Sequence, residues 1–313
     1  MENTTNKPIF VVGSPRSGTS ILTWCLGQHP NIFPVPESNW MGGFAVSAAA
    51  SYQVGVARGD RSILSAMDIS PEEFFANLGR SINDLILCHR ADLERKRQTT
   101  RPASEPKMRW TDGTPEYSFY ICALRKLFPE ALFVHVLRDV HDVVRSMLNF
   151  HRVAGFPIIG NENEAYKYWL RAVKACAQAE RAYGPRVVHR ICYAALVENP
   201  TPVMRSLLEF AGEAYCARCL EPLNTRINSS NVPTDFRIDD AAIDPAVVQE
   251  ATQLSRDLET TVQPAEASRA AADEMEAAFS QRTQYMATLE SQYLRVLQST
   301  RNVEKTKTPL APV

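Results

Sequence analysis

The chain has 313 residues, with 34 lysines and arginines against 35 aspartates and glutamates, which gives a formal net charge of −1. Hydrophobic residues make up 45% of the chain, which is typical of a globular protein that buries a core without metals or disulfides. The charge balance excludes a strong overall field for nucleic acid or an anionic membrane surface, but it allows a local basic site. No run is apolar enough for a membrane span, and the polar start over 1–7 is not typical of a signal peptide.

The seven cysteines are odd in number and scattered along the chain. This pattern favours reduced thiols in the cytoplasm over a disulfide framework. Cys216 and Cys219 form one C-x-x-C pair, but no second pair or nearby histidine completes a zinc site. We therefore expect a cytoplasmic protein without a metal, in which this pair packs on a helix face.

The first predicted element is a buried parallel strand over 7–12, which leads through a glycine-rich loop into a helix over 21–26. Such a turn presents successive backbone N–H groups and a helix N-terminus to an anion. We expect a phosphate to bind there. The loop residues that would line it are Arg16, Ser17, Gly18, Thr19 and Ser20.

This loop differs from the ATP- and GTP-binding pattern G-x-x-x-x-G-K-[ST]. Gly13 and Gly18 have the required spacing, and Ser20 stands at the hydroxyl position. Thr19 replaces the lysine that reaches the β- and γ-phosphates, and the cation is instead Arg16, inside the loop. The loop therefore predicts a nucleotide with one 5′-phosphate and a second anionic group beside Arg16, bound without Mg²⁺.

The next part of the chain, over 31–60, is aromatic and rich in glycine and alanine, and its pattern is mixed. A helix is predicted over 71–97, with Ser70 as its N-cap. A polar loop over 99–106 separates it from a further predicted helix over 114–127.

The strongest predicted strand covers 131–137 and leads into an amphipathic helix over 139–150. Arg138 leaves the strand at its carboxyl end, where parallel sheets bind ligands. Its planar guanidinium suits a phosphate, and Ser146, two turns along the helix, can donate its hydroxyl. The alternative is that Arg138 and Asp139 form a local cap and that Ser146 is a packing residue.

The remaining elements are a helix over 164–183, a strand over 186–193 and a helix over 202–211. Strands that alternate with helices predict an α/β fold in which a central, mostly parallel sheet is flanked by helices on both faces.

Residues 244–298 are strongly helical and form a C-terminal extension. Their apolar stripe consists of Met275, Phe279, Met286, Leu289, Tyr293 and Leu297. This extension could form a homodimer face or only cover the core. We expect one domain over 1–300 and a flexible tail over 301–313.

Two of these motifs resemble those of one known family. The segment over 8–20, with Pro-Arg-Ser-Gly-Thr-Ser, resembles the 5′-phosphosulfate loop of sulfotransferases, in the version typical of bacterial and tyrosylprotein-type members. Arg138 and Ser146 resemble the family's 3′-phosphate motif. The resemblance implies a P-loop-like three-layer fold, 3′-phosphoadenosine 5′-phosphosulfate (PAPS) as co-substrate and adenosine 3′,5′-bisphosphate (PAP) as product.

Weaker resemblances extend the match over roughly 8–231. Tyr193 and 196–200 resemble the family's Y-x-x-L-x-x-x-P segment. The segment over 226–231 stands where the family often places further serine contacts to the nucleotide. The resemblance thus implies that Tyr193, Ser229 and Ser230 also bind the cofactor.

One position departs from the family pattern. The segment over 110–115 resembles the family's K-T-P segment, but Gly113 stands where many relatives carry a lysine that stabilises the transferring group. Arg16 would then supply most of the cationic stabilisation of the leaving group. Lys107 and Arg109 are the alternatives that could reach in.

Sulfuryl transfer also needs a base for the acceptor hydroxyl, and Glu37 is our candidate. A helix over 18–28 is about 16 Å long at ~1.5 Å per residue, whereas extended chain over 31–37 spans about 23 Å at ~3.3 Å per residue. The chain can therefore turn at His29-Pro30 and return Glu37 to the loop. Relatives that sulfate polysaccharides and tyrosylproteins place their catalytic glutamate a similar distance after the same His-Pro.

Several alternatives remain open. Glu37 could be a solvated loop carboxylate. The histidines that could serve as base instead are His29, His135, His141 and His151. Of these, we expect His29 to cap its helix and His135 to lie in the core. Four apolar residues flank Glu37 and could line an acceptor pocket or belong to the core. They are Phe33, Trp40, Met41 and Phe44.

The sequence thus predicts a PAPS-dependent sulfotransferase that acts by in-line displacement on a hydroxyl, in preference to an amine. The acceptor could be a small molecule, glycan, lipid or polyketide. The alternative is a P-loop nucleotide-binding protein, kinase-like or regulatory, that transfers no sulfuryl group. We expect no nucleic acid partner and no membrane span.

Overall fold

The structure is a computed structural model that describes residues 7–97, 105, 107–150, 154–224, 232–233, 236 and 243–307. Three of the residues singled out above, Ser229, Ser230 and His151, lie outside the described residues, as does most of the loop predicted over 99–106.

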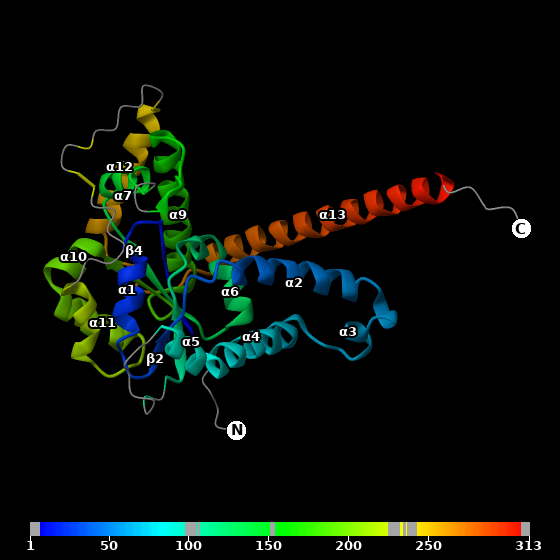
Figure 1. Cartoon of the computed structure of the whole chain (residues 1–313), viewed down its shortest axis with the longest axis horizontal. Helices are drawn as coiled ribbons and strands as arrows, with labels where there is room; N and C mark the ends of the chain where they lie inside the picture. Colours follow the sequence, from blue (N-terminus) through cyan, green and yellow to red (C-terminus); the bar gives the residue numbers. More distant parts are fainter. Residues whose placement is uncertain are drawn as a thin grey trace, which may run out of the picture.

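A five-stranded parallel sheet forms the centre of the fold, in the order β2-β3-β1-β4-β5 (Figure 1). The strands are β1 (Ile9–Gly13), β2 (Ile32–Pro34), β3 (Arg109–Asp112), β4 (Leu132–Leu137) and β5 (Val188–Cys192). In the central strand β1, Ile9 lies opposite Thr111 of β3 and opposite Leu132 of β4. Because every strand is parallel, all carboxyl ends meet at one edge of the sheet, as predicted for an α/β fold.

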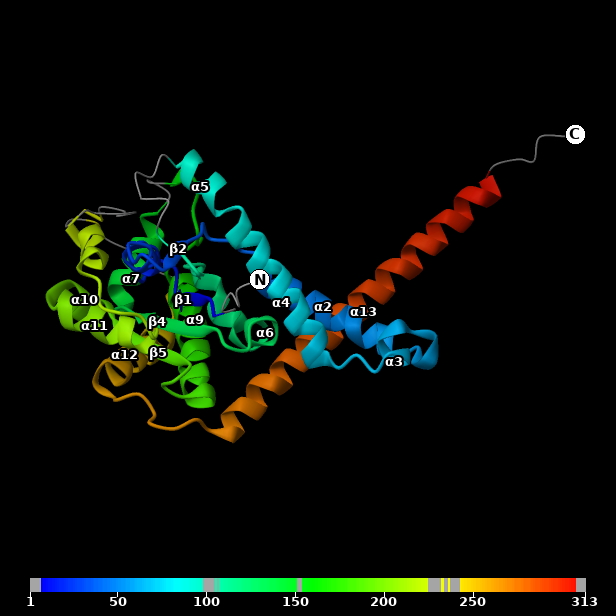
Figure 2. The ribbon, with the colours of Figure 1, turned by 90° about the horizontal axis from the view of Figure 1, so that it is seen from below.

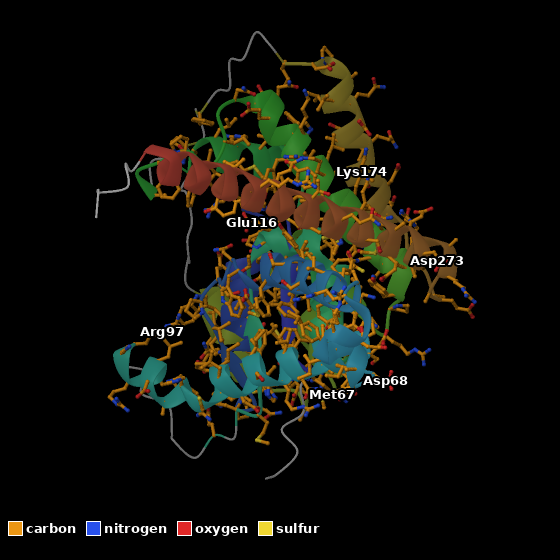
Figure 3. The ribbon with its side chains drawn as sticks, turned by 90° about the vertical axis from the view of Figure 1, so that its right-hand side faces the viewer. Met67, Asp68, Arg97, Glu116, Lys174 and Asp273 are labelled. Atoms are coloured by element: carbon orange, nitrogen blue, oxygen red, sulfur yellow. The ribbon has the colours of Figure 1, made fainter. Side chains whose placement is uncertain are left out.

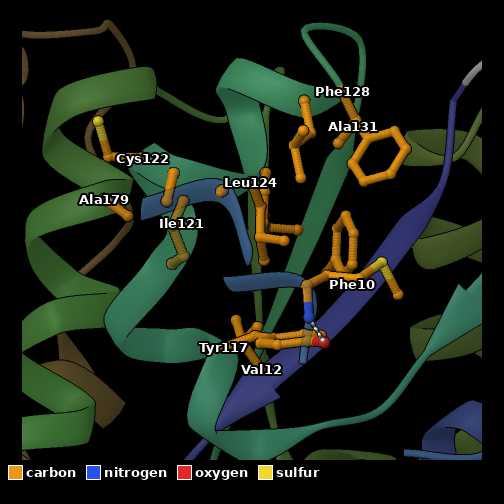
Figure 4. Close-up of a cluster of buried hydrophobic side chains, with 14 of the residues drawn as sticks. Phe10, Val12, Tyr117, Ile121, Cys122, Leu124, Phe128, Ala131 and Ala179 are labelled. Atoms are coloured by element: carbon orange, nitrogen blue, oxygen red, sulfur yellow. Dashed lines mark hydrogen bonds between the residues drawn. The ribbon is translucent and has the colours of Figure 1, made fainter. Parts of the chain in front are cut away.

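The side chains of β1 alternate between two hydrophobic clusters. Phe10 and Val12 point to one face of the sheet, and Ile9 and Val11 point to the other; all four are fully buried. Phe10 stacks on Phe133 of β4 with ring centroids 5.4 Å apart. Figure 4 shows Phe10 within its cluster, together with Leu124 and Phe128. Full burial of one such side chain stabilises a fold by about 1.5–3 kcal/mol, which explains why a short apolar run with no polar alternation forms the middle strand.

Helices cover both faces of the sheet (Figures 1 and 2). The Phe10 face is covered by α2 (Met41–Val56), α4 (Pro71–Cys88), α6 (Ile121–Leu127), α9 (Glu162–Tyr183) and the start of α13 (Arg269–Lys307). The Ile9 face is covered by α1 (Thr19–Leu26), α10 (Tyr193–Glu198), α11 (Pro200–Phe210) and the 3-10 helix η3 (Ala217–Asn224). A third cluster joins α7 (Val140–Leu148), α9 and α12 (Pro245–Thr260).

Several elements differ from the sequence-based expectation. The strands β2 and β3 and the helix α2 had no clear pattern, because β2 and β3 are very short and α2 is rich in glycine and alanine. The helix expected over 71–97 begins at Pro71 with Ser70 as N-cap, as predicted, but it breaks at His89 and continues as α5 (Arg90–Lys96). The region over 57–66 forms the 3-10 turn η1 (Gly59–Arg61) and α3 (Ile63–Ala66), and the helix expected over 114–127 begins as the 3-10 helix η2 (Pro115–Tyr120).

The C-terminal region is two helices, α12 and α13, and α13 continues to Lys307, into the segment expected to be a tail. Met275 of α13 is buried, and Phe279 and Met286 pack against the core. Farther along, Leu289 and Tyr293 are 40% and 63% exposed, and α13 leaves the body of the molecule (Figure 2). The first half of the predicted stripe therefore covers the core.

The cysteine pair packs as predicted, since Cys219 is buried on the Ile9 face of the sheet and Cys216 lies against the same cluster. Among the residues described, no helix combines the length and apolar character that crossing a bilayer requires.

Candidate active site

The carboxyl ends of all five strands deliver residues to one edge of the sheet. The glycine-rich loop follows the central strand β1, and Arg138 follows β4, the strand beside it. Glu37 follows β2, Gly113 follows β3 and Tyr193 follows β5. Residues that are far apart in sequence are thus brought to one place, which is where parallel sheets bind ligands.

The loop after β1 is held in a conformation that few residues adopt. Gly18 has a φ of 106°, and a Cβ at this position would lie 2.5 Å from a ring carbon of Tyr193. Arg16, which is not a glycine, also lies in the left-handed region, with a φ of 70°. Such strain persists where surrounding contacts impose it, and here the Arg16 side chain reaches the C-terminal end of α7.

The two predicted nucleotide motifs contact each other directly. Arg138 Nη1 donates to the backbone oxygen of Arg16 at 3.2 Å, and Arg16 Nε donates to Ser146 Oγ at 3.2 Å. The Arg138 guanidinium also lies 4.7 Å from the centre of the Tyr193 ring. The structure therefore brings together Arg16, Arg138, Ser146 and Tyr193.

Polar atoms at this place have no partner within the described part of the chain. Ser17 Oγ and Arg138 Nε are buried without a hydrogen bond there. Burial lowers the pKa of Arg16, the nearby charge of Arg138 lowers it further, and Glu37 partly opposes both. The pair formed by Arg138 and Asp142 at 3.3 Å is exposed on the Asp142 side, so it neutralises little of this charge. Free donors beside two cations fit an anionic ligand such as PAP or PAPS.

Glu37 returns to the first turn of α1, as the length argument predicted. Ser20 Oγ donates to Glu37 Oε1 at 3.3 Å. The backbone around Glu37 is fixed to the end of β3, because Val35 N donates to Thr111 O and Ser38 N donates to Thr114 Oγ1, both at 3.0 Å. Beside it lies a cavity of about 170 Å³. Its lining includes Ser20, Thr23, Trp24, Glu37, Arg97 and Gly113.

The surroundings of Glu37 make it a stronger base than an ordinary glutamate. The residue is exposed as a whole, but partial burial of its carboxyl raises the pKa of Glu37, and the negative charge of Glu116 raises it further. The hydrogen bond from Ser20 opposes this shift. Glu116, on η2, was not singled out in the sequence, although its position directly after Thr114-Pro115 of the K-T-P-like segment was a usable signal.

The glycine at 113 has a physical explanation in this fold. A Cβ there would lie 2.2 Å from Thr23 Oγ1, which donates to Thr19 O at 2.9 Å. Thr23 therefore fills the space through which a side chain at 113 would leave the backbone.

The expectation that Lys107 or Arg109 reaches the site is wrong. Lys107 Nζ is buried and donates to the backbone oxygens of three residues, Gly27 at 3.2 Å, His29 at 2.7 Å and Ile32 at 2.8 Å. Arg109 donates to Ala211 O at 2.6 Å and pairs with Glu213 at 3.2 Å. Both cations lie at the other end of α1 from the loop.

The described histidines that could serve as base form hydrogen bonds away from the loop. His29 lies beyond Gly27, the C-cap of α1, and its ring contacts Ala214 O at 3.0 Å and accepts from Asn31 N at 3.1 Å, so the side chain does not cap the helix as expected. His135 is buried in β4 against Glu180, as expected. His141 lies 2.8 Å from Tyr166 Oη.

The four apolar residues near Glu37 divide into two groups. Phe33 and Met41 are buried in the core on the Phe10 face, so their assignment to an acceptor pocket is wrong. Trp40 is 44% exposed and forms an edge-to-face pair with Phe44, with ring centroids 5.7 Å apart. This pair stays available to an acceptor.

Comparison with known proteins gives consistent results. Residues 8–216 match the model of the sulfotransferase family. The chain is 26% identical over 225 residues to an uncharacterized protein of Aquifex aeolicus (strain VF5), an alignment that covers 70% of this chain and 27% of that protein. It is 26% identical over 208 residues to protein-tyrosine sulfotransferase 1 of Danio rerio, covering 64% of this chain and 52% of that protein. The chain thus spans between about a quarter and a half of these two relatives.

Solved structures with similarity to the chain include the sulfotransferase domain of the Synechococcus PCC 7002 olefin synthase. It has a TM-score of 0.44 and 20% identity, and the match covers 90% of this chain and 97% of that domain. Sulfotransferase STF9 from Mycobacterium avium has a TM-score of 0.44 and 17% identity, with 84% of this chain and 79% of that chain covered.

Proposed function

The chain belongs to the sulfotransferase family, and we propose that it transfers a sulfuryl group from PAPS to an acceptor hydroxyl by in-line displacement, with release of PAP. The observation that carries this proposal is the contact between two motifs 122 residues apart, in which Arg138 donates to Arg16 O while Arg16 donates to Ser146. A dedicated arginine and serine for a 3′-phosphate suit PAPS better than ADP or ATP.

The loop residues have a defined role in this proposal. The bound donor supplies the sulfuryl group, and the bond between sulfur and the bridging oxygen of its 5′-phosphate breaks as the acceptor oxygen attacks. Negative charge develops on the phosphate oxygen, and the amides at the N-terminus of α1, Ser17 Oγ and the Arg16 guanidinium stabilise it. Arg138 and Ser146 hold the 3′-phosphate, and Tyr193 orients Arg138 through its ring.

Glu37 is the proposed base. Its carboxylate takes the proton of the acceptor hydroxyl as that oxygen attacks, and Ser20 holds the carboxylate at the first turn of α1. The raised pKa of Glu37 favours this transfer, because a more basic carboxylate accepts the proton more readily.

We also propose that the enzyme works in the cytoplasm. The support is that all seven cysteines, each within the described residues, are unpaired. The acceptor of the proposed reaction is a molecule with a hydroxyl that enters beside Trp40 and Phe44.

Calorimetry tests the donor assignment. We expect PAP to bind in the absence of Mg²⁺ at least about a hundredfold more tightly than ADP, because the 3′-phosphate adds charged hydrogen bonds. Arg138→Ala should remove most of this preference while affecting ADP little. Tighter binding of ADP, especially with Mg²⁺, would instead support a nucleotide-binding protein without sulfuryl transfer.

A further inference from the structure

A second and larger cavity, of about 980 Å³, opens between α9, α12, α13 and η2. Its wall is mainly one face of α9, opposite Arg282 of α13, Leu254 of α12 and Phe119 of η2. None of the donor-binding residues lines it, so this cleft is separate from the loop after β1.

The cleft is lined by four cations. Arg171, Lys174 and Arg181 recur along one face of α9, and Arg282 approaches from α13. At ~1.5 Å per residue, the three cations of α9 extend over about 15 Å. In a protein whose net charge is −1, this is a local concentration of positive charge.

Two of these cations are not neutralised by the chain. Lys174 pairs with Glu250, and Arg282 Nη1 donates to Phe119 O at 3.1 Å. Within the described residues, no hydrogen bond or ion pair engages the guanidinium of Arg171 or Arg181. Two further carboxylates border the cleft: Glu274 accepts from Gln178, and Glu116 accepts from Tyr168. The cleft therefore retains positive charge for an anionic ligand.

Part of the cleft lining is aromatic. Phe119 and Tyr168 form an edge-to-face pair with ring centroids 5.8 Å apart, and the Arg171 guanidinium lies 5.5 Å from the centre of the Tyr168 ring. An aromatic floor beside free guanidinium groups suits a flat apolar molecule that carries an acidic group.

The aromatic pair is connected to the proposed base through the segment over 114–116. Tyr168 Oη donates to Glu116 Oε1 at 3.5 Å. Two residues before Glu116, Thr114 Oγ1 accepts from the backbone N of Ser38, the residue that follows Glu37, at 3.0 Å. Figure 3 labels Glu116 and Lys174, which lie near α13 in that view.

We infer that this cleft binds the acidic end of the acceptor, an aromatic molecule with a carboxylate or phosphate at one end and the reacting hydroxyl at the other. The inference rests on the proposed function, since it takes Glu37 as the place where the hydroxyl reacts. It adds a substrate class that the donor site by itself does not indicate.

Two matched compounds test the inference. 6-Hydroxy-2-naphthoate has a hydroxyl at one end and a carboxylate at the other, whereas 2-naphthol lacks the carboxylate. The protein is first saturated with PAP, which blocks anion binding at the loop. Calorimetry should then show that the naphthoate binds at least about tenfold more tightly than 2-naphthol. The double variant Arg171→Gln/Arg181→Gln should abolish that difference.

The matched control variant is Arg186→Gln, an exposed arginine just beyond α9 that does not line the cleft. It should bind both compounds like the wild type, and both variants should keep their affinity for PAP. With PAPS present, sulfuryl transfer should favour the naphthoate over 2-naphthol, and the double variant should lose this preference through KM. Equal binding of the two compounds, or a difference that survives in the double variant, would overturn the inference.

The experiment separates this inference from the proposed function. The same titrations are repeated without PAP in Arg138→Ala, in which the donor site is weakened. The naphthoate should bind this variant as tightly as it binds the wild type. Naphthoate binding through Arg171 and Arg181 in a wild-type protein that fails to bind PAP would preserve the anion site but refute its role toward an acceptor. Tight PAP binding without any preference for the naphthoate would refute the cleft assignment and leave the proposed function standing.

Discussion

The two ends of α1 both carry a pair of cations, but the cations are bound in opposite ways. At the N-terminal end, Arg16 and Arg138 lie beside buried donors that have no partner in the described chain. At the C-terminal end, Lys107 donates to three backbone oxygens, and Arg109 donates to two backbone oxygens and a carboxylate, with only its Nη2 left without a partner in the described chain.

The contrast shows how to distinguish a binding cation from a structural one. The last carbonyl groups of a helix carry partial negative charge, so Lys107 neutralises the C-terminal end of α1 from within the protein. The first N–H groups carry partial positive charge, and at that end the chain places Arg16 and Arg138, whose charge Glu37 at the first turn only partly opposes. That arrangement suits an external anion, which supports the proposal that the N-terminal end is the binding site and the C-terminal end part of the scaffold.

The largest effect is expected at the N-terminal end. Glu37→Gln should lower turnover about 10²- to 10⁴-fold, because the acceptor hydroxyl loses its base, while the affinity for PAP is unchanged. Initial rates with labelled PAPS and an acceptor measure the turnover, and calorimetry measures the affinity for PAP. Glu209→Gln, at an exposed position on α11, is the control. Turnover like that of the wild type would remove Glu37 as the base.

At the C-terminal end the expected loss is in stability. Lys107→Met should lower the free energy of unfolding by about 3–5 kcal/mol, because Glu105 and three carbonyl groups lose a buried partner. Lys126→Met breaks the more exposed pair with Glu276 and should cost at most about 1 kcal/mol. Urea unfolding measures both. A change in PAP affinity in folded Lys107→Met would contradict the division between the two ends.

The fit between Gly113 and Thr23 is tested by a double-mutant cycle. Gly113→Ala should cost about 1–3 kcal/mol, because its Cβ would lie 2.2 Å from Thr23 Oγ1. Thr23→Ala removes that oxygen, so in the double variant the two changes should be coupled by about 1 kcal/mol or more. Gly43→Ala, on an open face of α2, is the control and should be neutral or stabilising. Simple additivity would show that Thr23 does not exclude a side chain at 113.

The smallest effect is a shift in pH dependence. Activity requires ionised Glu37 and is lost as the pH falls through its pKa, which Glu116 helps to raise. Glu116→Gln should therefore move the acidic limb of the pH–rate profile to lower pH, by less than about one unit. Glu116→Asp keeps the charge and should leave the limb near its original position. A limb that moves to higher pH in Glu116→Gln would disprove the coupling.

The donor side of the site was predictable because each motif is continuous in sequence and follows a clear strand. The loop that ends at Ser20 and the Arg138 motif are both continuous and both follow a strand. The expected lengths of helix and extended chain indicated that Glu37 returns to the loop. Contacts between distant segments were not predictable. The Tyr168 contact with Glu116 joins residues 52 positions apart, and no local pattern marks it.

The strand β3 was missed for a different reason. It has four residues, and it begins and ends with a charged side chain, Arg109 and Asp112, which local patterns assign to a loop. Both are nevertheless buried, because Glu213 pairs with Arg109 and Thr114 donates two hydrogen bonds to Asp112. Tertiary partners thus override the local pattern.

The place of β1 in the middle of the sheet also determines the order in which the protein can form. Ile9 pairs with Thr111 and with Leu132, so the strand that precedes the phosphate loop leaves the ribosome about a hundred residues before its neighbours. Parallel pairing over such separations forms slowly, and during that time the apolar strand is exposed to misfolding and aggregation. The loop is encoded near the start of the chain, yet it reaches its final conformation only after Tyr193 has been synthesised and packs against Gly18.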